Sequence, residues 1–254
     1  MLKISKGVIL CGGLGTRLRP LTLVTNKHLL PVYDQIMVIY PLETLKTLGI
    51  KDILIVSGGE NIGSFTEFLG DGSGYGVNLT YKVQKESGGI AEALGLAKDF
   101  IGDETFAVIL GDNLFDNKKL KGLGFFPEER ACIFLKEVPD PERFGVPVFS
   151  EDYSTTRETG ETFRIIKIEE KPKKPKNKYA VTGLYFYPSE VFDVISTLKK
   201  SERGELEITD VNNYFIEKET LDFKILDSFW CDCGTFDSLL SSSTWAKDNS
   251  KLDK

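Results

Sequence analysis

Residues 11–31 read CGGLGTRLRPLTLVTNKHLLP, and they follow the short apolar run GVIL at residues 7–10. A run of this kind predicts a buried strand, so the chain leaves a strand and enters a loop that contains Gly12, Gly13 and Gly15. Glycine allows a positive φ and a close approach of the backbone to a ligand. Successive free backbone N–H groups in such a turn suit an anion. We therefore predict that this loop holds a polyphosphate.

Side chains in and after the loop strengthen the phosphate prediction. Thr16 offers a hydroxyl, Arg17 a forked donor that matches phosphate oxygens, and Lys27 a second cation. The loop is not a Walker P-loop, because no Gly-Lys-Ser/Thr follows the glycines. Leu18 stands where a dinucleotide-binding fingerprint would have its third glycine, and Pro20 prevents an immediate helix.

The first half of the chain alternates strand-like and helix-like segments. Strands are predicted at residues 8–10, 53–57, 78–83 and 106–110, and helices at residues 40–48, 61–69 and 90–99. This rhythm predicts an α/β fold with a doubly wound, mostly parallel, Rossmann-like sheet. Ligands of such sheets bind beyond the carboxyl ends of the strands. The glycine loop, residues 84–89 and residues 111–112 all follow strands and should meet there.

The second half is richer in β-structure. Strands are predicted at residues 131–138, 144–149, 163–169, 179–187 and 222–226, with a polar hairpin loop at 150–162. Helices are predicted after residues 188–190, at about 209–218 and at 236–246, and the polar tail 247–254 should fray. We expect one domain over residues 1–254, divided into parts at about 1–130, 131–234 and 235–254.

The totals limit the possible functions. The chain has 254 residues, 41% of them hydrophobic, which is enough for a sizeable core. The net charge of −6 argues against general binding to nucleic acid or acidic membranes. No apolar run approaches the ~20 residues that cross a bilayer, and the start lacks a signal-peptide pattern. We expect a cytoplasmic protein that binds neither nucleic acid nor membrane.

The cysteines and the histidine exclude several site classes. The four cysteines form no disulfide framework and no zinc-type pair. Cys231 and Cys233 are expected to be reduced, packed thiols on one face of a strand, with Asp232 on the other face. His28 is the single histidine, which argues against a catalytic triad or a histidine-built metal centre.

Several blocks of sequence together carry a family resemblance. They are residues 12–22 (GGLGTRLRPLT), 27–32 (KHLLPV), 69–73 (LGDGS), 110–113 (LGDN), 170–172 (EKP), 180–185 (AVTGLY), 203–210 (RGELEITD) and 230–234 (WCDCG). In this order and over nearly the whole chain, the blocks resemble those of the glucose-1-phosphate thymidylyltransferase family of sugar-phosphate nucleotidylyltransferases. In place of the more usual Leu and Thr, Cys231 and Cys233 flank Asp232.

The resemblance implies roles for particular residues. Arg17, Lys27 and Asp112 would be catalytic, and Asp112 and Asp232 would hold Mg²⁺. The implied nucleotide-binding residues are Gly12, Gly13, Gly15, Thr16, Gln84 and Gly89, and the implied sugar-phosphate residues are Gly145, Glu170, Lys171, Val181, Tyr185 and Arg203. By residue type alone, the two aspartates could equally cap turns, Val181 could be ordinary strand packing, and Arg203 a surface charge.

The reaction implied by the resemblance joins dTTP and glucose 1-phosphate into dTDP-glucose, with release of pyrophosphate. Residues 1–130 would bind the nucleotide and residues 131–234 the sugar phosphate, and by family analogy the chain would form a homo-oligomer. A second reading is a sugar-1-phosphate uridylyltransferase that uses UTP, or both dTTP and UTP. The sugar could likewise be another hexose or an amino sugar. A third is a catalytically silent regulatory homologue, against which stand Arg17, Lys27, Asp112 and Asp232, all present here.

Overall fold

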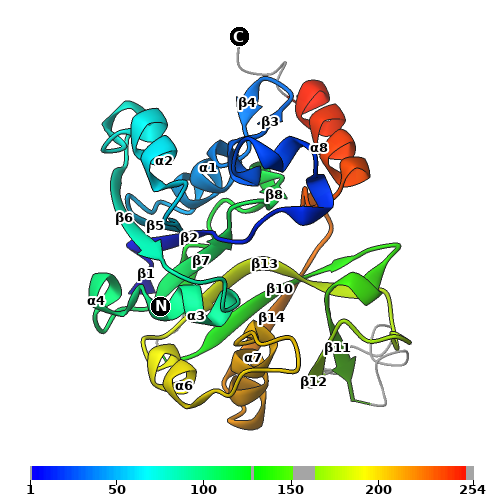
Figure 1. Ribbon diagram of the computed structural model, residues 1–254. Coiled ribbons are helices and arrows are strands. Elements are labelled where there is room, and N and C mark those ends of the chain that lie inside the picture. Colours follow the sequence, from blue (N-terminus) through cyan, green and yellow to red (C-terminus); the bar gives the residue numbers. More distant parts are fainter. Residues whose placement is uncertain (1, 127–128, 151–163, 250–254) are drawn as a thin grey trace.

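Seven strands from both halves of the chain form one central sheet in this computed structural model, which describes residues 2–126, 129–150 and 164–249. In spatial order they are β14 (Leu221–Leu226), β10 (Ala131–Glu137), β13 (Tyr179–Tyr187), β7 (Phe106–Leu110), β2 (Lys6–Cys11), β5 (Asp52–Gly58) and β6 (Asn78–Gln84) (Figure 1). Strands predicted in both halves of the sequence therefore lie in a single sheet.

Strand β13 is the antiparallel member of an otherwise parallel sheet. It pairs antiparallel with β7 on one side and with β10 on the other, whereas the β10–β14, β7–β2, β2–β5 and β5–β6 pairs are parallel. The start of β13 consequently lies at the same edge of the sheet as the carboxyl ends of β7 and β10. Four of the six strand pairs are parallel, so the predicted mostly parallel, doubly wound α/β fold is confirmed. Parallel strands are joined by crossover connections, usually helices, which cover the faces of the sheet.

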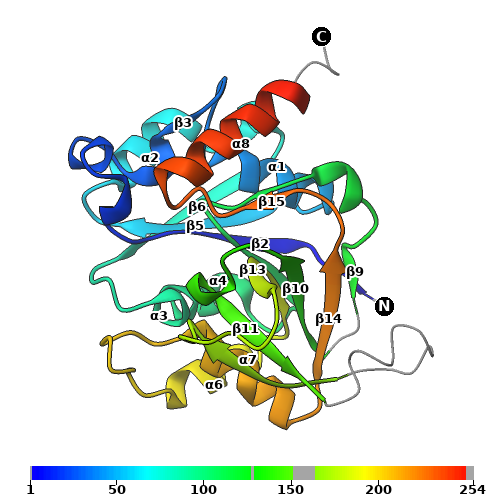
Figure 2. The ribbon, with the colours of Figure 1, turned by 90° about the vertical axis from the view of Figure 1, so that its right-hand side faces the viewer.

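Helices cover both faces of this sheet. They are α1 (Ile39–Thr47), α2 (Ile62–Leu69), α3 (Ile90–Gly95), α4 (Lys98–Ile101), α6 (Val191–Thr197), α7 (Ile208–Glu217) and α8 (Phe236–Asn249). Figure 2 shows α1, α2 and α8 above the sheet and α3, α6 and α7 below it. Alternation along β2 divides the core accordingly. Val8 and Leu10 face the cluster of α3, α6 and α7, while Ile9 and Cys11 face the cluster of α1 and α2.

Short strand pairs form separate two-stranded sheets outside the central sheet. They are β1 (Leu2–Lys3) with β9 (Phe125–Phe126), β3 (Pro31–Val32) with β4 (Gln35–Ile36), β8 (Leu114–Phe115) with β15 (Trp230–Cys231), and β11 (Gly145–Phe149) with β12 (Ile165–Glu170). The β8–β15 pair brings the end of the chain back beside the segment that follows β7. A third apolar cluster lies under α8 and includes Leu18, Leu114, Cys233 and Ala246.

Three sequence predictions need correction. The helix predicted at residues 90–99 is two helices, α3 and α4, because the backbone closes tight turns at Leu96 and Ala97 where Gly95 packs against Ile195. The last helix, α8, continues to Asn249 rather than to residue 246. The strand predicted from residue 163 begins at Ile165, and the predicted loop 150–162 and tail 247–254 lie outside the described residues apart from Ser150 and 247–249.

The expectation for Cys231 and Cys233 is wrong in its geometry. Strand β15 ends at Cys231, and Cys233 has a left-handed φ of 40°. The chain therefore turns at Cys233, and residues 231–233 do not form the predicted continuous strand. The Cys231 thiol donates to the Ser238 carbonyl, and the Cys233 thiol donates to the Ser242 hydroxyl. All four cysteines are free, as predicted.

Within the described residues, no helix combines the length and the apolar character that a bilayer crossing requires.

Candidate active site

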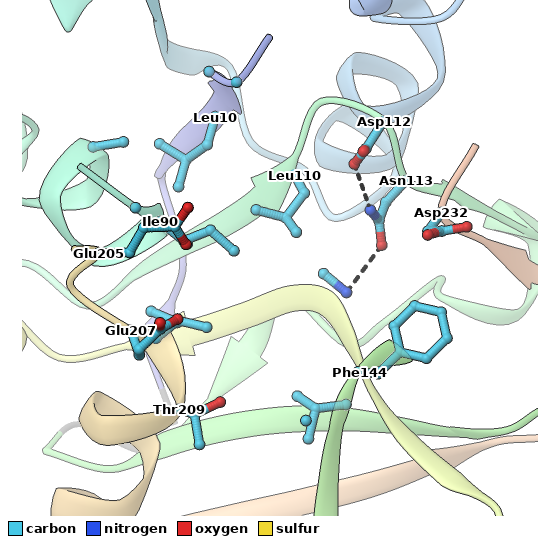
Figure 3. A pocket seen from close by; sticks show the side chains of 18 of the residues that line it. Leu10, Ile90, Leu110, Asp112, Asn113, Phe144, Glu205, Glu207, Thr209 and Asp232 are labelled. Carbon is cyan, nitrogen blue, oxygen red and sulfur yellow. Dashed lines mark hydrogen bonds between the residues drawn. The ribbon is translucent and has the colours of Figure 1, made fainter. Parts of the chain in front are cut away.

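A cavity of about 300 Å³ opens at the edge of the sheet where β2, β6 and β7 end and β13 begins. Its walls come from both halves of the chain, including the glycine loop after β2 and the segment that leads into α7. Figure 3 shows Leu10, Ile90 and Leu110 among its apolar lining, with Asp112 and Asp232 near one end and Glu205 and Glu207 near the other. The cavity therefore lies where a doubly wound sheet is expected to bind its ligand.

The glycine loop positions its cations through short 3₁₀ turns. One turn is η1 (Thr16–Leu18) and another is η3 (Lys27–Leu29), which Asn26 caps by accepting from the His28 amide at 2.9 Å. Gly15 has a φ of 59°, and a Cβ there would stand 2.9 Å from Thr22 Cγ2 and 3.1 Å from Lys27 Cβ. Only glycine thus lets the loop fold closely enough to bring Lys27 to the cavity.

Lys27 and Asp112 form an ion pair at the cavity wall. The Lys27 Nζ to Asp112 Oδ2 distance is 2.5 Å, and both side chains are largely buried. Burial alone would raise the pKa of Asp112, but the charge of Lys27 and the hydrogen bonds from Lys27 and Asn113 outweigh it and lower that pKa. Asp112 is therefore an ionised carboxylate. It can bind a metal ion once its ion pair with Lys27 is broken.

Asn113 forms hydrogen bonds to Asp112 and to Trp230, which lies two positions before Asp232. Its Nδ2 donates to Asp112 Oδ1 at 2.9 Å (Figure 3). Its Oδ1 accepts from the Gly183 amide at 2.9 Å and from Trp230 Nε1 at 2.7 Å. Asp232 follows Trp230 by two positions, so β7, β13 and β15 are joined at one point.

Arg143 holds the second aspartate. Its Nη2 donates to Asp232 Oδ2 at 2.7 Å and its Nη1 to Asp140 Oδ2 at 2.6 Å. Arg17 also approaches Asp232, because a Cβ placed on Gly234 would stand 2.9 Å from Arg17 Nη2 and 3.0 Å from Asp232 Oδ2. Two guanidinium groups thus lie near one carboxylate.

At the opposite end of the cavity, Arg203 forms ion pairs with three glutamates. Its Nη2 lies 3.0 Å from Glu205, 2.8 Å from Glu207 and 3.6 Å from Glu170. The hydrogen bond with Glu207 raises the pKa of Arg203 further. Glu170 also accepts from the Thr209 hydroxyl at 2.5 Å.

Lys171 is placed by an unusual backbone. Its φ is 44°, and its Nζ lies 3.2 Å from Glu170 Oε1. A non-glycine residue with this φ is uncommon and is found often at functional sites. The turn at Lys171 directs the cation to the end of the cavity where Glu170 and Arg203 meet.

Most residues predicted for the site line this cavity. They are Gly12, Gly13, Arg17, Lys27, Gln84, Gly89, Asp112, Gly145, Glu170, Lys171, Val181, Tyr185, Arg203 and Asp232. Gly15 and Thr16 do not, since Gly15 packs against Thr22 and Thr16 is exposed in η1. Their assignment to nucleotide binding stays a prediction, as do the individual roles of the lining residues.

Sequence reasoning missed several lining residues, above all Arg143, Asn113, Glu205 and Glu207. A signal was present for Arg143, because it is a cation two positions before Gly145, a predicted sugar-phosphate residue. Asn113 directly follows the predicted metal ligand Asp112, and the two glutamates belong to the RGELEITD block. Nothing local marks Asn113 as a link, since its partners lie 70 and 117 positions further along the chain.

The donor set fits a magnesium ion. Mg²⁺ in phosphate-transferring sites binds through one or two carboxylates and through substrate oxygens. Asp112 and Asp232 line the same cavity and supply two carboxylates. Among the residues that the structure describes, no group of three or more His, Cys, Asp or Glu is placed to hold a metal ion.

The chain matches known proteins over nearly its whole length. Residues 6–249 match the family model described as nucleotidyl transferase. A glucose-1-phosphate thymidylyltransferase of Mycolicibacterium smegmatis is 44% identical over 249 residues, which cover 95% of this chain and 82% of that protein. The chain belongs to the glucose-1-phosphate thymidylyltransferase family. The corresponding enzyme name is also carried by a Neisseria meningitidis protein that is 41% identical over 95% of this chain and 82% of its own length.

Solved structures place this thymidylyltransferase family member in the same fold group. A Bacillus anthracis protein assigned as a glucose-1-phosphate thymidylyltransferase, in complex with a sucrose, is 45% identical, superposes with a TM-score of 0.85 and is matched over 96% of both chains. A UDP-glucose pyrophosphorylase complexed with UDP-glucose superposes at 0.79 with 22% identity, over 96% of this chain and 99% of that one. The second likeness shows the shared fold alone.

Proposed function

We propose that the chain transfers a thymidylyl group from dTTP to glucose 1-phosphate, giving dTDP-glucose and pyrophosphate. The relatives named above support this activity. The observation that carries it is the cavity itself, in which Arg17, Lys27, Lys171 and Arg203 converge with a pair of aspartates. These cations come from segments far apart in the sequence and face one space, as two anionic substrates require.

The chemistry needs position and charge rather than a general base. A sugar phosphate oxygen attacks the α-phosphorus in line, and pyrophosphate leaves on the opposite side. The phosphate monoester is already an anion at neutral pH. The protein must therefore hold two mutually repellent anions at reacting distance and offset their repulsion with preorganised cations.

The charges of the cavity wall balance before substrate binds. Five cations, Arg17, Lys27, Arg143, Lys171 and Arg203, face five carboxylates, Asp112, Glu170, Glu205, Glu207 and Asp232. Ion pairs already join Lys27 with Asp112, Arg143 with Asp232, and Arg203 with Glu170, Glu205 and Glu207. Anionic substrates must therefore either displace acid partners or arrive with a counter-ion.

We propose that Asp112 and Asp232 hold Mg²⁺ together with substrate oxygens. The ion would supply positive charge against phosphate oxygens. Lys27 and Arg143 would then lose their carboxylate partners and be left to face the phosphates. In this proposal, the ion pairs of the free chain keep the two cations in place until substrate arrives.

We propose that the nucleotide occupies the end formed by the glycine loop, Gln84 and Gly89, and that the sugar phosphate occupies the end formed by Gly145, Glu170 and Lys171. This division follows the predicted parts at about residues 1–130 and 131–234. A homo-oligomer and a cytoplasmic location stay predictions. UTP in place of dTTP is the second candidate, because thymine and uracil differ by a methyl group that is worth only about 1 kcal/mol in an apolar pocket.

The test is a pyrophosphate-release assay with dTTP, UTP, dCTP, dATP and dGTP against glucose 1-phosphate and other hexose 1-phosphates, with and without Mg²⁺. We expect the highest kcat/KM for dTTP with glucose 1-phosphate. A higher value for UTP would replace the proposed activity by the uridylyltransferase. No turnover with any pair would favour the catalytically silent homologue.

A lysine variant tests the charge argument. Lys27→Met removes a cation that faces the α-phosphorus in the proposal, and kcat should fall roughly 10²- to 10³-fold. The matched control is Lys174→Met, which removes the same charge from an exposed position outside the cavity and should leave kcat unchanged. A folded Lys27→Met enzyme with full activity would contradict the mechanism.

A further inference from the structure

Gln84 ends β6 at the cavity wall, and its amide group has two different surroundings. Its side chain is 6% exposed, so the amide must find its partners within the protein or on a ligand. The carbonyl oxygen Oε1 lies beside Gly12, where a Cβ would stand only 2.8 Å away. Both Gly12 and Gln84 line the cavity, so this oxygen belongs to the cavity side.

Glu92 holds the other half of that amide. Gln84 Nε2 donates to Glu92 Oε1 at 3.2 Å. Glu92 lies in the first turn of α3 and is not among the residues that line the cavity. Its carboxylate packs against Gly88, where any Cβ would overlap it. The position of this carboxylate is therefore fixed by the turn that leads into α3.

An ionised carboxylate can only accept hydrogen bonds. If the Gln84 amide turned over, its Oε1 would face the Glu92 oxygens, and two acceptors would oppose each other in a largely buried place. Leaving buried polar groups in this state is strongly unfavourable. Glu92 thus permits one orientation of Gln84, in which the cavity receives the carbonyl oxygen and the second N–H of Nε2.

That orientation distinguishes between pyrimidines. Thymine and uracil present a ring N–H donor beside carbonyl acceptors, which complements an acceptor beside a donor. Cytosine presents a ring nitrogen acceptor beside an amino donor, which would complement the amide only after it turned over. The two orientations of one glutamine would therefore read two different bases.

We propose that Glu92 is a specificity-determining positioning residue, which makes the base subsite select thymine or uracil over cytosine by fixing the orientation of the Gln84 amide. This inference rests on the proposed function, because it takes the glycine loop end of the cavity as the nucleotide subsite. Glu92 itself touches no substrate and acts through Gln84.

The test compares kcat/KM for dTTP and dCTP, each with glucose 1-phosphate, in the wild type and in Glu92→Gln. A glutamine at position 92 can donate as well as accept, so it permits both orientations of Gln84. We expect the dTTP/dCTP ratio to fall roughly 10- to 100-fold, mainly through a gain for dCTP. Glu92→Ala removes the acceptor altogether and should lower the ratio in the same direction, which covers the case in which one variant fails to fold.

The control is Asp99→Asn in α4, which removes one negative charge from an exposed position and should keep the wild-type ratio. A merely structural role of Glu92 would lower kcat/KM for both nucleotides alike and leave the ratio unchanged. A ratio unchanged in every folded Glu92 variant overturns the inference.

Titration calorimetry with dTDP and dCDP separates this inference from the proposed function. If the wild type turned over none of the nucleotides, the activity proposal would fail, but the ratio of the two dissociation constants would still test Glu92. Wild type that binds dCDP as tightly as dTDP would contradict the inference whatever the activity.

Discussion

At the scale of single residues, the site depends on buried polar groups whose charge is set by their neighbours. Lys27 lowers the pKa of Asp112 against the opposing effect of burial. The adjacent His28 is only 1% exposed, and its Nδ1 lies 2.6 Å from Asn26 Oδ1. Burial and then the charge of Lys27 lower the pKa of His28 from 6.5 to about 3. The ring is therefore neutral in the folded protein at neutral pH.

This histidine predicts a pH dependence of stability. Below about pH 6.5 His28 is protonated in the unfolded chain, whereas in the folded chain it stays neutral down to about pH 3. Because the unfolded chain binds the extra proton, the free energy of unfolding rises with pH between these two values and falls on acidification. From pH 7 to pH 5 the linkage amounts to about 2 kcal/mol. Because His28 is the single histidine, His28→Gln should abolish this part of the slope.

The measurement is urea unfolding at several pH values between 7 and 5, with the free energy of unfolding plotted for both proteins. Carboxylates contribute to both curves, so the difference between the curves isolates His28. Parallel curves would show that His28 is not held neutral by its surroundings.

At the scale of elements, Asn113 joins three strands that carry functional side chains. Its oxygen accepts from Gly183 in β13 and from Trp230 in β15, and its amide group donates to Asp112 at the end of β7. A Cβ on Gly183 would stand 2.6 Å from Asn113 Oδ1, so only glycine lets β13 approach this closely. One side chain therefore ties the segment that carries Asp112 to β13 and to the strand that leads to Asp232.

Asn113→Ala should lower both the stability of the protein and its catalytic activity. It leaves the Trp230 indole N–H and the Gly183 amide without their acceptor, at about 1–3 kcal/mol for each buried group. We expect a free energy of unfolding about 2–6 kcal/mol lower, together with weaker Mg²⁺-dependent activity because Asp112 loses the hydrogen bond that orients it and Trp230, two positions before Asp232, loses its anchor. Thermal denaturation and the pyrophosphate assay measure the two effects.

Asn249→Ala serves as the comparison, since that side chain is exposed and donates to the Trp245 carbonyl within α8. It should change stability by less than about 0.5 kcal/mol. Equal stability of the two variants would mean that Asn113 does not link the strands.

At the scale of the whole molecule, the last helix closes the core beneath the first loop. Helix α8 contributes Ala246 to the cluster that contains Leu18 of the glycine loop and Cys233 beside Asp232. Trp245 stacks on Phe229 with ring centroids 4.5 Å apart. Figure 1 shows α8 beside the blue segments near the start of the chain. The glycine loop and the last helix thus pack in one cluster beside Asp232.

Two glutamate substitutions on α8 test this closure. Ala246 is 5% exposed, so Ala246→Glu buries an unpaired charge, whereas Leu240 is 68% exposed, so Leu240→Glu places the same charge in solvent. We expect Ala246→Glu to lower Tm by about 6 °C or more and Leu240→Glu to have little effect. Differential scanning calorimetry distinguishes the outcomes, and similar Tm values for both would contradict the proposed support.

Local pattern predicted much of the fold because periodicity and apolar runs report local structure. It located the strands of the central sheet, and the chain's departure from β2 into a glycine loop located one rim of the cavity. It failed at Gly95, where contact with Ile195 accompanies the break between helices, and at Cys233, where the chain turns instead of continuing a strand. These errors arise from tertiary contacts that no local window contains.

The order and spacing of residue types along this chain determined by themselves its family, its α/β class and many of the polar groups of the cavity wall, though not Arg143, Asn113, Glu205 or Glu207. The tertiary structure alone decided which groups pair: Lys27 with Asp112, Arg143 with Asp232, and Glu92 with Gln84. The physical reason is strand pairing: β2 lies beside β7, which brings Lys27 to Asp112, and β15 pairs with β8, which brings Asp232 back to the same site. Contacts across 85 or 89 positions depend on which strands become neighbours, and neighbours are chosen by packing of the whole sheet.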